Sequence, residues 1–306
     1  MAKNPQGFLA RAGLPGAVLQ SMRPRQWIKN LVVLAALVFA GKLTDPPTMI
    51  RALAACALFC AASGAIYIFN DLFDVDRDRR HPGKARRPIA AGRLGTAAAL
   101  TSGVLILTGA LMTGFILSPP FGAVMVIYAV LNLAYSLWLK EVVIIDVMII
   151  ASGFVLRAVG GGLAIDVVVS EWLVLCTLLL SLFLAFCKRR QELEALAEAH
   201  DHRPSLREYS IGFIDQMINV VTPSALLAYI LYTVSPEVEM KLNTRYLYLT
   251  VPFVLYGIFR YLFLVHRRGE GGNPAQSLLT DRPLLICVGL WALSVVVILY
   301  VARPAV

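Results

Sequence analysis

The chain has 306 residues, of which 58% are hydrophobic and only 15% are charged, and its formal net charge is +9. Soluble globular proteins carry about 25% charged residues, so this composition excludes a soluble enzyme and indicates a membrane protein. Apolar runs recur from one end to the other, which predicts a single polytopic membrane domain over residues 1–306. The basic residues flank these runs and give no reason to expect a nucleic-acid partner.

Nine apolar stretches are long enough, or nearly so, to cross a bilayer, which takes about 20 residues. An odd number of spans places the two ends of the chain on opposite sides of the membrane. The sequence therefore predicts an all-α bundle of nine transmembrane helices. The spans lie near residues 30–45, 51–70, 96–117, 120–138, 142–165, 172–187, 212–234, 246–265 and 284–302.

Lysine and arginine indicate the orientation, because they gather in the cytoplasmic loops of membrane proteins. With the N-terminus inside, the predicted cytoplasmic segments hold 21 of the 28 Lys and Arg residues, and the outer segments hold 5. We therefore expect a multi-pass membrane protein with a cytoplasmic N-terminus and an outer C-terminus.

Residues 1–29 form a predicted cytoplasmic or interfacial segment, and Lys29 is its last residue before the first span. The ammonium group of Lys29 is a candidate to bind the phosphate of a lipid or of a soluble substrate. A plain interfacial anchor is the alternative interpretation.

An acidic and basic stretch, FNDLFDVDRDRRHPGKARRP, follows the second span over residues 69–88. On a helix, Asp71, Asp74 and Asp78 fall within roughly 60° of one another. Three neighbouring carboxylates repel unless a cation lies among them, and hard oxygen ligands of this kind suit Mg²⁺. Asn70 can orient a ligand or a metal-bound water. The alternative is a charged helix end held by Asp–Arg pairs.

The fifth predicted span contains two charges, Asp146 and Arg157, which lie eleven residues apart and so face the same side of a helix. Charges within a membrane are costly and usually line a functional cavity. We expect both to face a polar cavity. The alternative is that neighbouring helices satisfy them as structural charges.

The sixth span ends in FCKRRQELEAL, which places Lys188, Arg189 and Arg190 together, with Glu192 one turn after Lys188. Such a group suits bare phosphate oxygens. By itself the run is also typical of an ordinary basic flank on the cytoplasmic side of a span.

The pattern Asn70-Asp71-x-x-Asp74-x-x-x-Asp78 resembles the first aspartate-rich motif of the UbiA superfamily of intramembrane prenyltransferases. This resemblance implies nine transmembrane helices, with the motif at the cytoplasmic end of the second. Members that bind a prenyl diphosphate usually carry a second, DxxxD-like motif at the end of the sixth helix. Here the basic residues that begin at Lys188 stand in its place.

This departure is similar to one branch of the superfamily, the decaprenyl-phosphate phosphoribosyltransferases. The branch implies transfer of 5-phosphoribosyl from phosphoribosyl diphosphate to a long-chain polyprenyl (decaprenyl) phosphate, with Mg²⁺ as cofactor, in lipid-linked pentose or arabinan precursor synthesis for the cell wall. The resemblance covers nearly the whole chain. The stretches that carry it are MRPRQWIKN, HPGKARRPIAAG, LAYSLWLK, GFVLRAVGGG, KRRQEL and NPAQSLLTDRPLL.

The resemblance also implies roles for individual residues. Three aspartates would hold the metal and act in catalysis: Asp71, Asp74 and Asp78. A second group would bind the substrates, with its basic members on phosphates and its tyrosines as cavity hydroxyls: Lys29, Asn70, Lys84, Arg87, Tyr135, Arg157, Lys188, Arg189, Glu192 and Tyr209.

Two other functions stay open at this point. The first is a UbiA-type aromatic prenyltransferase, which joins a prenyl diphosphate to an acceptor such as 4-hydroxybenzoate; the basic end of the sixth span counts against it. The second is a transporter or lipid flippase. Nothing in the sequence resembles an inverted repeat with broken half-helices, which many transporters contain.

Overall fold

The computed structural model of the protein describes residues 13–80, 83–196, 208–268 and 274–301. Eight helices in these ranges are long and apolar enough to cross a membrane, and they coincide with eight of the nine predicted spans. They are α4 (Pro46–Phe73), α6 (Thr96–Leu117), α7 (Pro119–Leu137), α8 (Ile145–Ala164), α9 (Glu171–Leu196), α11 (Ile211–Val234), α13 (Val251–Arg268) and α15 (Arg282–Tyr300).

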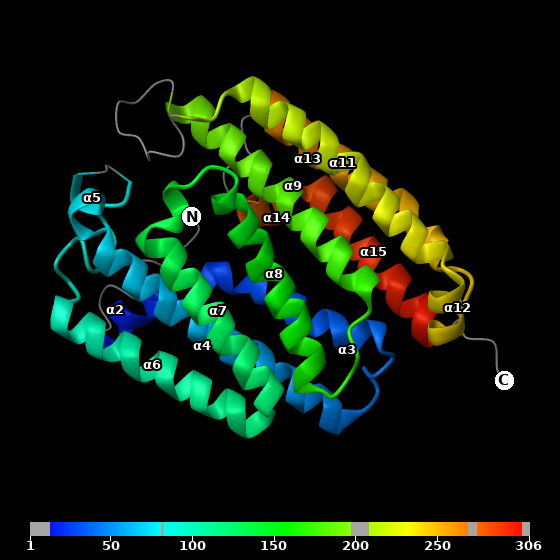
Figure 1. Ribbon diagram of the computed structural model, residues 1–306, viewed down its shortest axis with the longest axis horizontal. Helices are drawn as coiled ribbons and strands as arrows, with labels where there is room; N and C mark the ends of the chain where they lie inside the picture. Colours follow the sequence, from blue (N-terminus) through cyan, green and yellow to red (C-terminus); the bar gives the residue numbers. More distant parts are fainter. Residues whose placement is uncertain (1–12, 81–82, 197–207, 269–273, 302–306) are drawn as a thin grey trace.

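Figure 1 shows how these helices are arranged. Helices α4, α6 and α7 pack together on one side, α11, α13 and α15 pack on the other, and α8 and α9 lie between the two groups. Short elements connect them: α2 (Gly13–Ser21), η1 (Pro24–Leu34), α3 (Ala35–Phe39), α5 (Val75–Arg80), η2 (Leu139–Glu141), α12 (Pro236–Leu242), η3 (Leu247–Thr250) and α14 (Pro274–Thr280).

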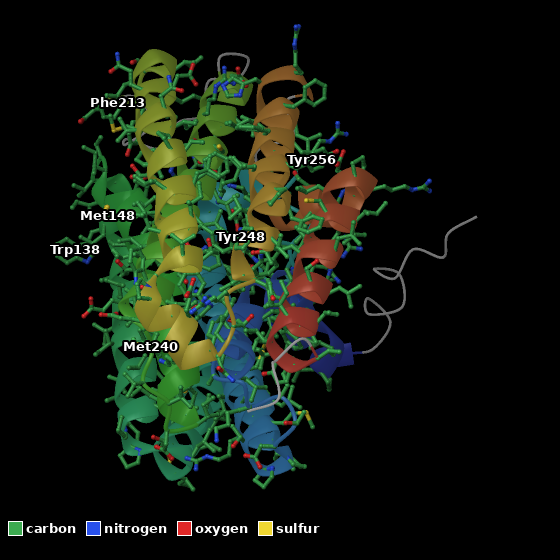
Figure 2. The ribbon with its side chains drawn as sticks, turned by 90° about the vertical axis from the view of Figure 1, so that its right-hand side faces the viewer. Trp138, Met148, Phe213, Met240, Tyr248 and Tyr256 are labelled. Carbon is green, nitrogen blue, oxygen red and sulfur yellow. The ribbon has the colours of Figure 1, made fainter. Side chains whose placement is uncertain are left out.

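Large side chains with apolar surface project from the outer surface of the bundle. Trp138, Met240 and Tyr256 are examples, with 62%, 75% and 49% of their surface exposed, and Figure 2 shows them pointing outward. In water, so many exposed apolar side chains would form patches that promote association. Lipid solvates them, so the outer surface agrees with a multi-pass membrane protein.

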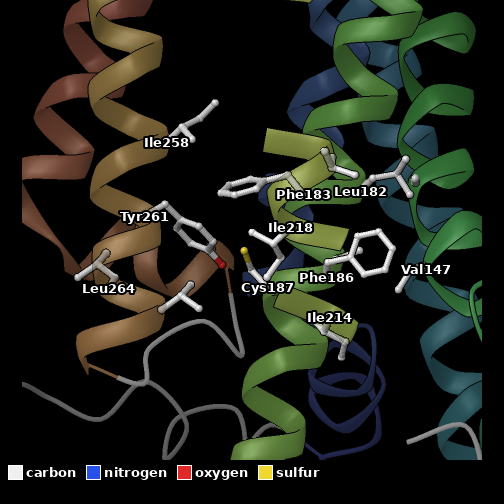
Figure 3. Packing of buried hydrophobic residues seen from close by; sticks show 14 of the residues in the cluster. Val147, Leu182, Phe183, Phe186, Cys187, Ile214, Ile218, Ile258, Tyr261 and Leu264 are labelled. Atoms are coloured by element: carbon white, nitrogen blue, oxygen red, sulfur yellow. The ribbon is translucent and has the colours of Figure 1, made fainter. Parts of the chain in front are cut away.

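A compact core of α8, α9, α11 and α13 fixes the end of α9. Phe183, Phe186 and Cys187 of α9 are almost fully buried, and they pack against Ile214 and Leu264 (Figure 3). Because a helix is rigid over one turn, this core also sets the direction of the basic residues that follow Cys187 directly.

The first predicted span, residues 30–45, is not one α-helix. The chain forms a 3₁₀-helix, η1, followed by the five-residue helix α3. η1 packs against α4 and α8, and its residues Asn30 and Val33 are fully buried. A 3₁₀-helix is wound more tightly than an α-helix, which suits a segment enclosed by two neighbours. Hydropathy does not distinguish such an enclosed segment from a lipid-facing span.

The glycine run Gly160–Gly162 of α8 lets its neighbours approach closely. A Cβ atom at Gly160 would lie 2.9 Å from the ring of Phe59, and one at Gly161 would overlap the carbonyl of Val33 in η1. Helix α8 continues through the run to Ala164. The glycine run therefore permits close helix approach without breaking the helix.

Gly161→Ala is expected to lower the stability of the fold by about 2 kcal/mol, because the new methyl group meets backbone atoms that cannot rotate away. Thermal unfolding of the purified protein in detergent measures the effect. Gly109→Ala in α6 is the matched control, since a Cβ atom there meets nothing within 4 Å and alanine favours the helix. Equal unfolding temperatures for the two variants would contradict the close approach.

Candidate active site

The aspartate segment lies where α4 ends. Helix α4 stops at Phe73, Asp74 leaves the helical conformation, and the short helix α5 follows. The continuous helix expected through the three aspartates is therefore wrong, because the chain bends at Asp74. Asp71 and Asp78 stay together on the two sides of this bend, and both are buried, with 2% and 3% of their surface exposed.

A single guanidinium group joins Asp71 and Asp78. Nη1 of Arg87 donates to Asp71 Oδ1 at 3.1 Å and to Asp78 Oδ2 at 2.5 Å. Arg23, at the start of η1, forms a second ion pair with Asp71. Two buried carboxylates this close repel each other, and the shared cation removes that repulsion. Arg87 therefore touches the aspartates, which places this predicted substrate-binding residue within the acidic cluster.

Asp74 pairs with a different part of the chain. Its Oδ1 atom lies 2.9 Å from Nζ of Lys140 in η2, a lysine that is 5% exposed. Asn70, half-buried one turn earlier, accepts the N–H of Asp74 with its backbone carbonyl at 3.0 Å. Each aspartate of the motif therefore has a cationic partner within the protein.

Arg23 and Lys140 were not among the predicted site residues. The sequence signal for them was only their presence in the stretches MRPRQWIKN and LAYSLWLK. Arg23 has a φ of 54°, in the left-handed region that non-glycine residues rarely adopt. Its guanidinium carbon lies 4.8 Å from the centre of the Tyr67 ring, so stacking and the ion pair with Asp71 hold this conformation together.

The alternative of ordinary Asp–Arg pairs describes the outer part of the segment. Asp76 lies at the surface and pairs with Arg79 at 3.4 Å, and Arg77 lies 3.9 Å from Glu141. Exposed pairs of this kind contribute little stability. The buried aspartates differ, because their partners lie outside the helices that carry them, and those of Asp71 and Asp74 include the distant residues Arg23 and Lys140.

The aspartates supply oxygen ligands that Mg²⁺ prefers, without a closed cage. Among the described residues, no three carboxylate, His or Cys side chains are grouped so that they could hold a metal by themselves. Mg²⁺ usually takes one or two carboxylates and completes its shell with water and substrate phosphates. Asp71 and Asp78, whose oxygens converge on one nitrogen, fit a divalent cation that arrives with a diphosphate.

At the end of α9, protein groups enclose Arg189 completely, leaving it 1% exposed. Its Nε donates to Asp146 Oδ2 at 2.7 Å, Nη2 donates to the Tyr135 hydroxyl at 3.0 Å, and Nη1 pairs with Glu192. In this structure the guanidinium therefore holds protein groups. Asp146 is the reason, because this fully buried carboxylate requires a cation. A phosphate-binding role for Arg189 stays a prediction.

Tyr209 completes the same network. Its hydroxyl donates to Asp146 Oδ1 at 2.9 Å and accepts the N–H of Ile144 at 2.7 Å. Ile144 has a φ of 69°, a strained value for a β-branched residue. Burial and the nearby carboxylate raise the pKa of Tyr209, which keeps its proton available for Asp146. For Asp146, the interpretation as a structural charge satisfied by neighbouring helices is correct.

Two predicted basic residues are more accessible. Lys188 is 37% exposed, and its Nζ lies 3.6 Å from Glu192 Oε1, which is long for a strong ion pair. Lys84 is half-buried in the segment between α5 and α6. Both are therefore more accessible to soluble phosphates than Arg189 is.

The hydrogen bonds of Arg157 go to neutral groups and do not reach Asp146. Nε donates to Asn30 Oδ1 at 2.6 Å, Nη2 donates to the Tyr128 hydroxyl at 2.6 Å, and Nη1 donates to the Gly153 carbonyl at 2.8 Å. Arg157 is only 6% exposed. It is thus a buried cation without a carboxylate partner among the described residues.

Lys29 lies next to this arginine, half-buried at the inner side of η1. Burial, together with the charges of Lys188, Arg157 and Arg23, lowers the pKa of Lys29 to about 7. The ion pairs of the described residues include none to Lys29. Arg23 and Lys188 have carboxylate neighbours in Asp71 and Glu192. Lys29 and Arg157, in contrast, form no ion pair with a carboxylate of the described residues.

Comparison with known proteins connects these features to a family. The sequence pattern of the "UbiA prenyltransferase family" matches residues 30–280. The chain belongs to this family. Among the relatives of this UbiA family member are the decaprenyl-phosphate phosphoribosyltransferases of Mycolicibacterium smegmatis, 34% identical over 91% of each chain, and of Corynebacterium glutamicum, 31% identical over 94% of this chain and 88% of the relative.

The fold of this family member agrees with solved structures. A UbiA homolog from Archaeoglobus fulgidus bound to GPP and Mg²⁺ has a TM-score of 0.68 and 17% sequence identity, and it covers 92% of this chain and 99% of the homolog. The all-helical UbiA fold expected from the aspartate motif is therefore confirmed. Metal binding in that homolog agrees with a metal-dependent family.

Arg87→Gln in this family member is expected to strengthen Mn²⁺ binding about tenfold in the absence of diphosphate, because Arg87 competes with the metal for Asp71 and Asp78. The same variant should weaken binding of magnesium diphosphate. Paramagnetic resonance of free Mn²⁺ measures the first effect. Arg86→Gln, at an exposed neighbouring position, is the control. Unchanged Mn²⁺ affinity in Arg87→Gln would contradict the competition.

An oxyanion bound beside Lys29 is expected to bind more weakly as pH rises above 7. The anion stabilises the charged lysine, so binding to the neutral form requires uptake of a proton. With a pKa of about 7 for Lys29, affinity for sulfate should fall roughly fivefold between pH 7 and pH 8. Sulfate does not titrate in this range, so any pH dependence of its affinity measured by calorimetry comes from protonation of the protein. A pH-independent affinity would contradict the assignment, and Lys29→Gln should abolish the dependence.

Proposed function

We propose that this protein transfers 5-phosphoribosyl from phosphoribosyl diphosphate to a long-chain polyprenyl phosphate, such as decaprenyl phosphate, and releases diphosphate. The main support is the unequal charge of two helix ends. The end of α4 carries buried aspartates, whereas the end of α9 carries Lys188 and two arginines. Both arginines pair with carboxylates of the protein, which leaves Lys188 as the basic residue of this helix end that is accessible to a phosphate. The names of the mycobacterial and corynebacterial relatives agree with the proposed transfer.

The chemistry needs no strong general base, because the attacking phosphate oxygen of the lipid is already an anion. The attack forms a bond to the anomeric carbon of ribose and breaks the bond to diphosphate. The barrier lies in the charge of the leaving group and in the positive charge that develops on the ribose ring. Mg²⁺, when bound by Asp71, Asp74 and Asp78, would neutralise the departing diphosphate.

The basic residues that pair with the aspartates also bind the diphosphate in this proposal. When a diphosphate binds, Arg87, Arg23 and Lys140 turn from the carboxylates to the diphosphate oxygens. Asn70 orients the ligand at the same end of α4. Lys84 and Lys188 are more accessible than Arg189, and they guide the soluble donor to the site. Arg189, Glu192, Tyr135 and Tyr209 hold the end of α9 in place.

The lipid acceptor has a suitable groove beside the aspartates. A wholly apolar cavity of about 510 Å³ lies between α4, α6 and α7, and Phe69, Leu72 and Phe73, which flank the first two aspartates, form one of its walls. We assign it to the first part of the polyprenyl chain, with the remainder in the surrounding lipid. The lipid phosphate then lies at the level of Asp71, where the soluble donor arrives.

The proposal includes the orientation in the membrane. One membrane domain has nine segments, the first being residues 30–45 in η1 and α3, and it lies in the bacterial inner membrane with a cytoplasmic active site. The N-terminus is cytoplasmic and the C-terminus is outside, although residues 1–12 and 302–306 lie outside the described ranges. The product then serves as a precursor in lipid-linked pentose or arabinan synthesis.

A paired assay on purified protein in detergent tests the function. One sample contains labelled phosphoribosyl diphosphate and a polyprenyl phosphate; the other contains a prenyl diphosphate and 4-hydroxybenzoate. We expect label in the lipid phase of the first sample, and only with Mg²⁺. A prenylated aromatic product in the second sample alone would show that the protein is an aromatic prenyltransferase.

The same assay with two aspartate variants tests the metal ligands. Asp71→Asn should lower the rate at least about a hundredfold, because the diphosphate loses its neutralising cation. Asp76→Asn is the matched control, since Asp76 belongs to the same segment but its carboxylate is exposed and pairs with Arg79 at the surface. Equal rates for the two variants would remove Asp71 from the metal site.

A further inference from the structure

Protein groups hold the guanidinium of Arg157 in place, but they accept only three of its five N–H groups. The rings of Tyr128 and Phe154 lie 4.7 and 5.3 Å from the guanidinium carbon. Three of its N–H groups donate to neutral protein groups, one from each nitrogen. One N–H on Nη1 and one on Nη2 therefore have no partner in the described part of the chain.

Lys29 is a second positively charged residue near Arg157. It precedes Asn30, whose side chain accepts from Arg157 at 2.6 Å, and its charged neighbours are Arg157, Lys188 and Arg23. Neither Lys29 nor Arg157 forms an ion pair with a carboxylate of the described residues. Buried cations that lack an anion are costly, and two together are more so. An anionic ligand relieves this cost.

We propose that Lys29 and Arg157 form a phosphate-binding site that works without a metal ion. The inference rests on the proposed function and deepens it, because it assigns a separate set of residues to a second phosphate of the substrates. Arginine offers N–H pairs that fit phosphate oxygens, and lysine adds a point charge. A phosphate monoester with two negative charges balances both residues. With no carboxylate present, the site offers nothing to hold Mg²⁺.

The position of the site indicates which phosphate it takes. The amide of Asn30 lies 3.2 Å from Ser63 Oγ of α4, and Ser63 precedes Asp71 by eight residues, or roughly 12 Å along the helix. The site thus lies deeper in the bundle than the aspartates. Both substrates carry a phosphate monoester, but the apolar groove begins at the level of Asp71. This favours the 5-phosphate of the donor over the lipid phosphate.

Calorimetry in EDTA tests the site with two probes, ribose 5-phosphate and farnesyl phosphate, a short soluble lipid phosphate. We expect the wild-type protein to bind ribose 5-phosphate without metal, and Arg157→Gln and Lys29→Gln each to weaken it at least tenfold. Arg25→Gln is the matched control, since it removes an exposed charge from the same η1 segment. Binding of magnesium diphosphate should change less than twofold in all three variants.

The outcomes separate the possibilities. If Arg157→Gln and Lys29→Gln lose binding of farnesyl phosphate alone, Lys29 and Arg157 do bind a phosphate, but it is the phosphate of the lipid acceptor. If the wild type binds neither probe in EDTA, or if both variants bind as wild type does, the inference is wrong. Thermal unfolding checks each variant, and Lys29→Gln decides alone if Arg157→Gln does not fold. Phosphoribosyl transfer by the same wild-type sample is the separate test of the proposed function.

Discussion

The whole site depends on one constraint: a charge buried in an apolar bundle needs a compensating charge or hydrogen bonds. Asp71, Asp78 and Asp146 are at most 3% exposed, and each is paired with an arginine. The partners belong to other segments, so each pair also fixes one segment against another. Arg87 ties the loop after α5 to the end of α4, and Arg189 ties α9 to α8.

The same constraint separates structural charges from candidate substrate-binding charges. Arg189 is the most deeply buried of the basic residues, and its donors are used by acidic and hydroxyl groups of the protein. Arg157 is buried and Lys29 is half-buried, but their contacts among the described residues are neutral or cationic. A basic residue in a membrane bundle is thus a candidate ligand-binding group when the protein leaves its charge uncompensated, and burial alone does not make it one.

The fold by itself does not decide the reaction. A homolog with GPP and Mg²⁺ bound has the same architecture at 17% identity, and one architecture supports different chemistry when its site residues change. In this chain the end of α9 carries Lys188, Arg189 and Arg190. The buried core of α9 with α11 and α13 holds that helix end in position whatever charges it carries.

The sequence by itself determined the eight long helices and the family, because hydropathy and the aspartate spacing are local properties. It did not determine that residues 24–34 form an enclosed 3₁₀-helix, since an apolar segment has the same composition against helices as against lipid. Only the tertiary structure decided the partners of each charge. Arg23 and Asp71 are 48 residues apart, and Lys140 and Asp74 are 66 apart. Such pairs form because folding brings distant charges into one low-dielectric interior, where an unpaired charge is costly, and no local pattern records that choice.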